Sequence, residues 1–121
     1  MEEKKTVVFG ASENVERYAN KAIRSLRRHG HPVIAIGLRE GKVLDVDIIK
    51  ENPPIDNVDT VTLYMSERNQ KHLQDYILSL NPKRIIYNPG AENPELEALA
   101  EEKGIENMEA CTLVLLATNQ F

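Results

Sequence analysis

The alternation of short β-branched runs with segments of helical period constrains the fold of this chain more than any other feature. The first run, Thr6–Phe9, stops at the small residues Gly10-Ala11-Ser12, and a polar turn follows. The next segment has apolar residues at the i, i+3, i+4, i+7 spacing of an amphipathic helix. A strand that ends at a small-residue turn and passes into a helix is how many proteins hold a phosphate group. The apolar positions of this helix are Ala19, Ala22, Ile23 and Leu26.

Further helices and strands follow in alternation. A second helix is expected to begin at Ser66 and to end at Asn81-Pro82. A third is expected to begin with Asn93 as N-cap and Pro94 in the first helical position. Short apolar runs between the helices predict strands, and a small helix is expected near the end of the chain, over residues 112–117. The expected strands are 6–9, 33–36, 60–64, 84–87 and 106–109.

This order predicts a doubly wound α/β domain with a mainly parallel, five-stranded, Rossmann-like sheet. None of the apolar runs shows a long strict alternation, which is typical of strands that are buried on both faces of a parallel sheet. At 121 residues, the chain is long enough for one domain around one core, spanning residues 1–121. The crossover at residues 37–58 has no helical stripe and has room for one more short edge strand near residues 43–48.

Composition and charge indicate which partners and which cellular compartment to expect. The net charge is −4 and no basic cluster is present, which argues against nucleic acid as the main partner. No apolar run approaches the ~18 residues of a membrane span, and the first residues lack the apolar core of a signal peptide. The single cysteine, Cys111, excludes an intramolecular disulfide and fits a reducing compartment. A soluble cytoplasmic protein is therefore expected.

The predicted topology indicates where a ligand would bind, independently of any sequence motif. In doubly wound sheets, ligands bind beyond the carboxyl ends of the strands, where the strand order reverses. This rule selects four loops, at residues 10–18, 37–39, 64–67 and 88–92. The first loop offers Gly10 for close backbone approach, the Ser12 hydroxyl and the start of a helix that favours an anion. Arg17 and Lys21 are spaced i, i+4 near that start.

Each of these features also has a purely structural interpretation. A Gly-x-Ser sequence after a strand is often a tight βα turn, and Asn88-Pro89-Gly90 is ordinary turn chemistry. Arg17 and Lys21, taken singly, are typical of a solvated helix face. The convergence of all of them at one end of one sheet favours a bound phosphate.

The type of phosphate ligand is less constrained by the residues. The dinucleotide fingerprint needs three glycines, and this turn has only Gly10. A cation at Arg39, after the second strand, suits a phosphorylated ribose, as in NADP or coenzyme A, whereas NAD prefers an acid there. Arg39-Glu40-Gly41 is equally typical of an exposed turn.

Several stretches resemble the small bacterial and archaeal CoA-binding proteins, which are similar to the N-terminal domain of the succinyl-CoA synthetase α-subunit. The resemblance rests on the run from Val7 to Ser12, on Arg17 and Lys21, and on His29-Gly30-His31-Pro32-Val33 before the second strand. It spans nearly the whole chain, and its further matches are Val58-Asp59, the Asn88-x-Gly90 loop, Lys103-Gly104-Ile105 and Cys111.

The resemblance implies that coenzyme A or an acyl-CoA lies across these loops. Gly10, Ala11 and Ser12 would contact the diphosphate, with Arg17 and Lys21 near the phosphates and Asn14 in the same turn. The adenosine end would be bordered by Gly37, Leu38 and Arg39, where many relatives carry Asn-Pro or Ser-Pro. The rest of the ligand would be lined by Tyr64, Met65, Asn88, Pro89 and Gly90.

No catalytic constellation is visible in the sequence. His29, His31 and His72 are expected to be surface or packing residues, and no His or Cys pair has metal-ligand spacing. Cys111 is either a buried small hydrophobe or a thiol near the pantetheine end that forms a mixed disulfide with coenzyme A.

We therefore expect a non-catalytic CoA-binding domain that acts as sensor, carrier or regulatory module. An NADP-binding redox or redox-sensing protein is the first alternative. The second is an interaction module with a vestigial pocket, acting through a protein partner or as a homodimer.

Overall fold

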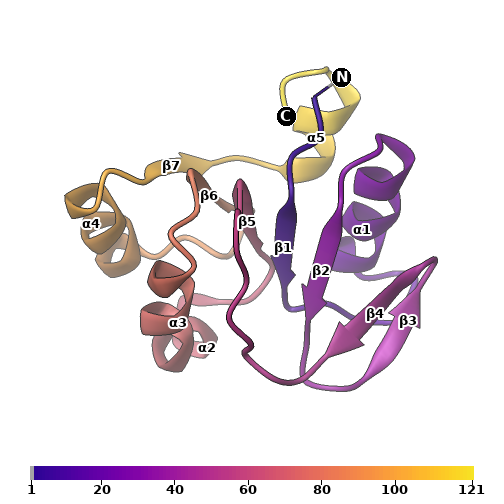
Figure 1. The fold of residues 1–121 in the computed structure, drawn as a ribbon, viewed down its shortest axis with the longest axis horizontal. Helices are drawn as coiled ribbons and strands as arrows, with labels where there is room; N and C mark the ends of the chain where they lie inside the picture. The colour runs from indigo at the N-terminus through magenta and orange to yellow at the C-terminus, as the bar shows by residue number, and fades with distance from the viewer. Residues whose placement is uncertain (1) are drawn as a thin grey trace.

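The sheet grows outward from its middle strand, first to one side and then to the other (Figure 1). The computed structural model describes residues 2–121. Seven strands lie in the order β3-β4-β2-β1-β5-β6-β7. The strands are β1 (Thr6–Phe9), β2 (Val33–Ile36), β3 (Gly41–Val43), β4 (Val46–Ile49), β5 (Thr60–Leu63), β6 (Arg84–Tyr87) and β7 (Glu106–Glu109).

Every pair of neighbouring strands except β3–β4 is parallel. The strands β1, β5 and β6 are buried along their whole length, as expected for β-branched runs without a polar face. The prediction of a doubly wound, mainly parallel, Rossmann-like sheet is confirmed.

The prediction of five strands is wrong by two. β3 and β4 form an antiparallel hairpin inside the crossover, with Val43 opposite Val46, so that two residues make the turn. The first of them, Leu44, has φ +54, a conformation that hairpin turns usually assign to Asn, Asp or Gly. The turn therefore carries no sequence signal at this residue, and the sequence suggested only one short strand here.

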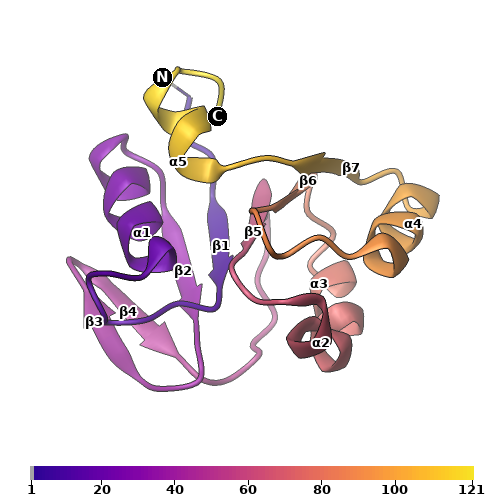
Figure 2. The ribbon, with the colours of Figure 1, turned by 180° about the vertical axis from the view of Figure 1, so that it is seen from behind.

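Helices cover both faces of the sheet (Figures 1 and 2). On one face, α1 (Tyr18–Arg28) and α5 (Thr112–Ala117) cover a buried cluster that includes Val8, Ile23 and Leu116. The other face carries a second cluster, which includes Phe9, Ile77 and Leu96. It is covered by α2 (Glu67–Gln70), the 3-10 turn η1 (Lys71–Leu73), α3 (Gln74–Ser79) and α4 (Pro94–Glu102).

The helix expected to begin at Ser66 and to end at Asn81-Pro82 is divided into α2, η1 and α3. Ser66 precedes α2 but makes no side-chain capping bond. The tighter turn of η1 accompanies the burial of both Gln70 and Gln74 in one cluster of amides. At α4 the prediction is confirmed, because the Asn93 side chain accepts a hydrogen bond from the Leu96 N–H and Pro94 is the first helical residue.

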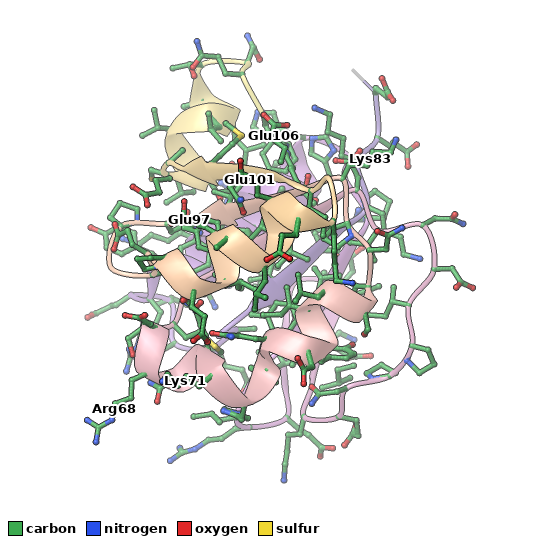
Figure 3. All side chains as sticks on the ribbon, turned by 90° about the vertical axis from the view of Figure 1, so that its left-hand side faces the viewer. Arg68, Lys71, Lys83, Glu97, Glu101 and Glu106 are labelled. Carbon is green, nitrogen blue, oxygen red and sulfur yellow. The ribbon has the colours of Figure 1, made fainter. Side chains whose placement is uncertain are left out.

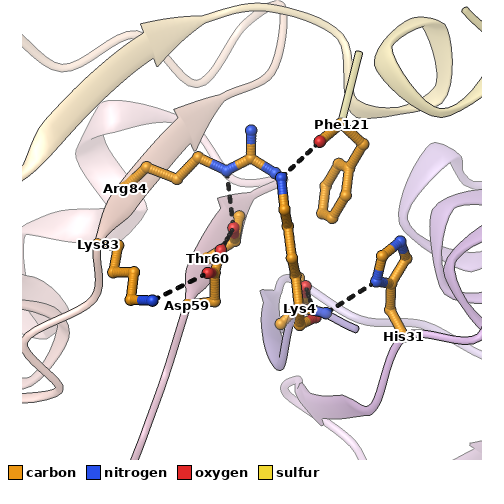
Figure 4. Close-up of polar contacts among 8 residues, drawn as sticks. Lys4, His31, Asp59, Thr60, Lys83, Arg84 and Phe121 are labelled. Atoms are coloured by element: carbon orange, nitrogen blue, oxygen red, sulfur yellow. Dashed lines mark hydrogen bonds and ion pairs between the residues drawn. The ribbon is translucent and has the colours of Figure 1, made fainter. Parts of the chain in front are cut away.

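A cluster of basic groups closes the amino end of the sheet, opposite the predicted site (Figure 4). His31 Nδ1 accepts a hydrogen bond of 3.0 Å from the Lys4 main-chain N–H. The Lys4 ammonium donates to the main-chain oxygen of Phe121 at 2.6 Å, and the Phe121 ring centre lies 4.9 Å from the centre of the His31 ring. The guanidinium carbon of Arg84 lies 4.3 Å from the same phenyl ring. A cavity of about 180 Å³ adjoins the cluster, lined by Glu2, Lys4, His31, Leu116, Asn119 and Phe121.

Acidification is expected to destabilise the protein through His31. Burial lowers the pKa of this imidazole, and electrostatic repulsion from His29, Lys4 and Arg84 lowers it further, whereas Asp59 acts in the opposite direction. The unfolded chain therefore binds a proton more readily, and below about pH 6.5 the free energy of unfolding falls. Urea unfolding between pH 8 and pH 5 measures this slope. In His31→Gln, which keeps an acceptor for Lys4, the slope should be smaller; an unchanged slope would assign it to other groups.

Candidate functional site

The four predicted loops meet at the carboxyl edge of the sheet. Phe9, at the end of β1, is in register with Ile36 of β2 and with Leu63 of β5, and Leu63 is in register with Tyr87 of β6. From β1 the chain passes to β2 on one side and later to β5 on the other, so the strand order reverses at β1. This is the switch point at which ligands bind in open α/β sheets.

Gly10 brings the turn after β1 very close to the turn after β5. Its φ is +85, and a methyl group on its Cα would lie 2.8 Å from the Tyr64 carbonyl oxygen. The N–H groups of Gly10 and Ala11 both donate to the Ile36 carbonyl, at 3.0 and 3.1 Å. These two N–H groups are therefore already hydrogen-bonded to β2 in this conformation. They are not free to donate to a diphosphate, which is the group that Gly10 and Ala11 are predicted to contact.

The loop between β1 and α1 crosses the end of β2. A methyl group on Gly37 would collide with the Ala11 carbonyl oxygen, so only glycine fits beneath the loop. The Glu13 carboxylate accepts a hydrogen bond of 2.8 Å from the Lys42 N–H and thereby ties the loop to β3. Sequence reasoning did not select Glu13, because a glutamate in a polar turn gives no signal of a partner 29 residues away.

The polar residues of the first loop stabilise its shape. Ser12 Oγ accepts from the Asn14 N–H at 3.1 Å, and Asn14 Oδ1 accepts from the Glu16 N–H at 3.0 Å. The buried side chain of Asn20 donates to the Ser12 carbonyl at 2.9 Å, a contact that the sequence did not predict. Arg17 is the N-cap residue of α1 without a side-chain capping bond, so this helix start has no side-chain acceptor at its cap.

Exposed groups surround this helix start. Arg17 and Lys21 are both exposed, and the Lys21 ammonium lies 5.2 Å from the centre of the Tyr18 ring. Tyr18 is itself exposed, as is Leu38 after β2, whose side chain is 89 % accessible. Arg39 next to it is also exposed. This part of the carboxyl edge therefore combines cations with uncovered apolar side chains.

Asn88 lies beneath the surface rather than on it. Its amide donates to Thr62 Oγ1 at 2.7 Å and to the Leu63 carbonyl at 2.8 Å, and its oxygen accepts from the Thr112 N–H at 2.8 Å. Only 2 % of the residue is exposed. Asn88 thus joins the ends of β5 and β6 to the start of α5 and supports the edge from below.

The remaining predicted residues differ in exposure. Pro89 and Gly90 are exposed, and the Gly90 N–H donates to the Glu92 carboxylate at 3.0 Å. Tyr64 and Met65 are half-buried. Burial raises the pKa of the Tyr64 phenol well above its usual range, so the hydroxyl keeps its proton at neutral pH. Cys111, before α5, is half-buried.

Within residues 2–121, no group of three or more His, Cys, Asp or Glu side chains is placed to hold a metal ion, and no helix is long and apolar enough to cross a bilayer. His31 is buried at the amino end of the sheet, and His72 is exposed on η1.

A second groove, of about 690 Å³, lies between α4 and β7 and is strongly acidic. Figure 3 shows Glu97 and Glu101 on α4, with Glu106 of β7 above them. Burial raises the pKa of the Glu97 carboxyl, and the neighbouring Glu109 raises it further. Neither this groove nor the cavity beside His31 is lined by a predicted site residue.

Comparison with known proteins decides the family. Residues 4–117 match the family described as "CoA binding domain". The chain belongs to this CoA-binding family. The resemblance noted in the sequence is thereby confirmed over nearly its whole length.

Several solved structures have a similar fold. A crystal structure of a protein described only as uncharacterized is 49% identical, with a TM-score of 0.97 over 100% of both chains. The cell-free ID.343 protein of Thermus thermophilus has a TM-score of 0.81 at 21% identity, over 98% of this chain and 91% of its own. The acetyl-coenzyme A synthetase 1 of Ca. Korarchaeum cryptofilum has a TM-score of 0.71 at 16% identity, over 89% of this chain and 26% of its own. The search of curated proteins gave no match.

Proposed function

We propose that this protein binds coenzyme A or an acyl-CoA at the carboxyl edge of the sheet, without catalysing a reaction by itself. Its role is that of a sensor, carrier or regulatory module. The observation that carries the site is the approach of Gly10 to Tyr64 at the switch point, where the backbone leaves no room for a side chain. Membership of the CoA-binding family supports the ligand.

The charges and apolar side chains of the edge fit the two ends of such a ligand. Arg17 is the N-cap residue of α1 and Lys21 lies in its first turn, where the helix dipole also favours an anion. The exposed Leu38 side chain offers an apolar contact to an adenine ring or a pantetheine chain, and the neighbouring Arg39 offers a cation to a ribose phosphate.

We also propose that the protein is not catalytic, on the basis of the side chains at the same carboxyl edge of the sheet. The titratable side chains predicted to bind the ligand are Arg17, Lys21, Arg39 and the half-buried, protonated Tyr64, none of which is a carboxylate or a histidine. Two carboxylates in the same loops, Glu13 and Glu92, accept hydrogen bonds from main-chain N–H groups. The half-buried thiol of Cys111 lies two residues after the end of β7.

An NADP-binding redox function is the second candidate, because Arg39 suits either phosphorylated ribose. Calorimetric titration with coenzyme A, dephospho-coenzyme A, NADP and NAD separates the two. We expect coenzyme A to bind with a Kd in the micromolar range, about −8 kcal/mol, and the dephospho form to bind about tenfold more weakly. Binding of NADP alone would replace the proposed ligand, and no binding at all would favour the interaction module.

Two arginine variants test whether Arg39 distinguishes coenzyme A from dephospho-coenzyme A. In Arg39→Ala, coenzyme A and dephospho-coenzyme A should bind equally, because the cation facing the ribose phosphate is lost. Arg28→Ala removes an exposed arginine at the far end of α1 and should leave the preference intact. A preference that survives in Arg39→Ala would remove Arg39 from the site.

A further inference from the structure

A cluster of buried amides lies under the half of the carboxyl edge formed by β5 and β6. The Asn93 Nδ2 group donates to Gln70 Oε1 at 2.8 Å and to Gln74 Oε1 at 2.9 Å. Asn93 and Gln70 are fully buried, and Gln74 is 7 % exposed. The side-chain amides of Gln70 and Asn93 each donate two hydrogen bonds, and the Gln74 amide donates one, to the Glu95 carboxylate at 2.7 Å.

Gln70 differs from its neighbours in what it binds. Its Nε2 group donates to the Met65 carbonyl at 2.7 Å and to the Ala91 carbonyl at 2.8 Å. Met65 lies in the turn after β5, and Ala91 follows Gly90 in the turn after β6. One amide group therefore joins two turns that the chain separates by 26 residues, since Met65 and Ala91 are that far apart in the sequence.

The orientation of this amide is fixed by its surroundings. Two carbonyl oxygens accept from its nitrogen, and the Asn93 amide donates to its oxygen, so a flipped Gln70 would place like groups against one another. The Tyr64 N–H donates to the Phe9 carbonyl of β1, and the Ala91 N–H donates to the Asn88 carbonyl within its own turn, so neither of these main-chain bonds joins the two turns. Gln70 supplies a link between the turns.

We propose that Gln70 is a positioning residue, which holds the turns after β5 and β6 at a fixed separation so that the edge is ordered before its ligand arrives. This inference rests on the proposed binding of coenzyme A at that edge. A loop that is ordered in advance does not have to be immobilised on binding, and affinity is correspondingly higher. Gln70 was not selected from the sequence, because a glutamine within a helical segment is typical of a solvent-exposed polar position.

Gln74 provides a matched control. Gln70→Met and Gln74→Met each remove one buried glutamine from the same amide cluster, and each leaves Asn93 without one acceptor. Only Gln70→Met frees the Met65 and Ala91 carbonyls. We expect both variants to unfold at lower temperature than the wild type, and only Gln70→Met to bind coenzyme A about tenfold more weakly in calorimetric titration.

Hydrogen exchange gives a readout that does not need the ligand. In Gln70→Met, the amides of residues 64–66 and 88–92 should exchange faster than in Gln74→Met, while the amides of β1 remain protected in both. Equal exchange and equal affinity in the two variants would overturn the inference. If the wild type does not bind coenzyme A, the proposed function fails, and the exchange comparison still decides whether Gln70 orders the turns.

Gln70→Glu serves as a second variant if Gln70→Met does not fold. The carboxylate keeps an acceptor for Asn93 but presents an oxygen to two carbonyls, which repels them at pH 8. At pH 5 a protonated carboxyl can donate to one of them. Exchange in the two turns, measured relative to the wild type at each pH, should therefore slow at pH 5; a pH-independent ratio would contradict the inference.

Discussion

Replacing Gly10 with alanine is expected to destabilise the protein and to abolish ligand binding at the carboxyl edge. The residue has φ +85, and the added methyl carbon would lie 2.8 Å from the Tyr64 carbonyl oxygen and 3.1 Å from its carbon. The left-handed conformation costs an L-residue about 1–2 kcal/mol, and overpacking against backbone about 1–3 kcal/mol more. Urea unfolding and titration with coenzyme A measure the two effects separately.

Gly30→Ala isolates the contribution of the conformation. Gly30 has φ +81, but a methyl group there has no atom within 4 Å, and it lies between α1 and the amino end of β2. The stability of this variant should fall only by the free energy that the left-handed conformation costs an alanine, and the variant should bind coenzyme A as the wild type does. If Gly10→Ala lost no more stability than Gly30→Ala and still bound the ligand, the contact between the two turns would not define the site.

Replacing Asn88 with alanine is expected to lower the free energy of unfolding by a similar amount, here because buried hydrogen bonds are lost. The change removes three hydrogen bonds and leaves the buried Thr112 N–H without its acceptor. Loss of such a buried network should lower the free energy of unfolding by about 2–4 kcal/mol. Because Thr112 begins α5, amide exchange in that helix should rise before the rest of the protein unfolds.

Asn69→Ala is the control for this change. Asn69 is exposed in α2, and a helix position of this kind tolerates alanine well. Its stability should remain within about 0.5 kcal/mol of the wild type. A loss in Asn88→Ala no greater than that in Asn69→Ala would show that the network contributes little.

Much of the fold could be predicted because its signals are local. β-branched runs, helical periods and the Asn93-Pro94 cap specify their elements within a few residues, and chirality of the crossovers then favours one arrangement. The hairpin of β3 and β4 could not be recognised, because its turn begins with Leu44 at positive φ instead of a turn residue. The division at η1 depends on the burial of Gln70 and Gln74, which only tertiary contacts determine.

The sequence predicted where the candidate site lies, but not which side chains hold its loops in position. Topology alone selects the four loops, and the assignment of Gly10, Arg17, Leu38 and their neighbours to a ligand stays a prediction. Glu13, Asn20 and Gln70 were missed, since each acts through one hydrogen bond or two to a distant or buried carbonyl or amide. Asn88 was selected as a lining residue, and the structure places it below the surface with its hydrogen bonds already made.

The acidic side chains of β7 disfavour pairing of a second copy with this edge of the sheet. β7 is an edge strand with Glu106 and Glu109 exposed at its two ends. A second copy pairing there in the centred antiparallel register would set Glu106 of each copy against Glu109 of the other, and like charges directly opposite destabilise a sheet. The other rim is the three-residue β3, with Lys42 exposed at its centre. Charge at both edge strands disfavours extension of the sheet into a second copy, and we expect a homodimer to join through helices or loops instead.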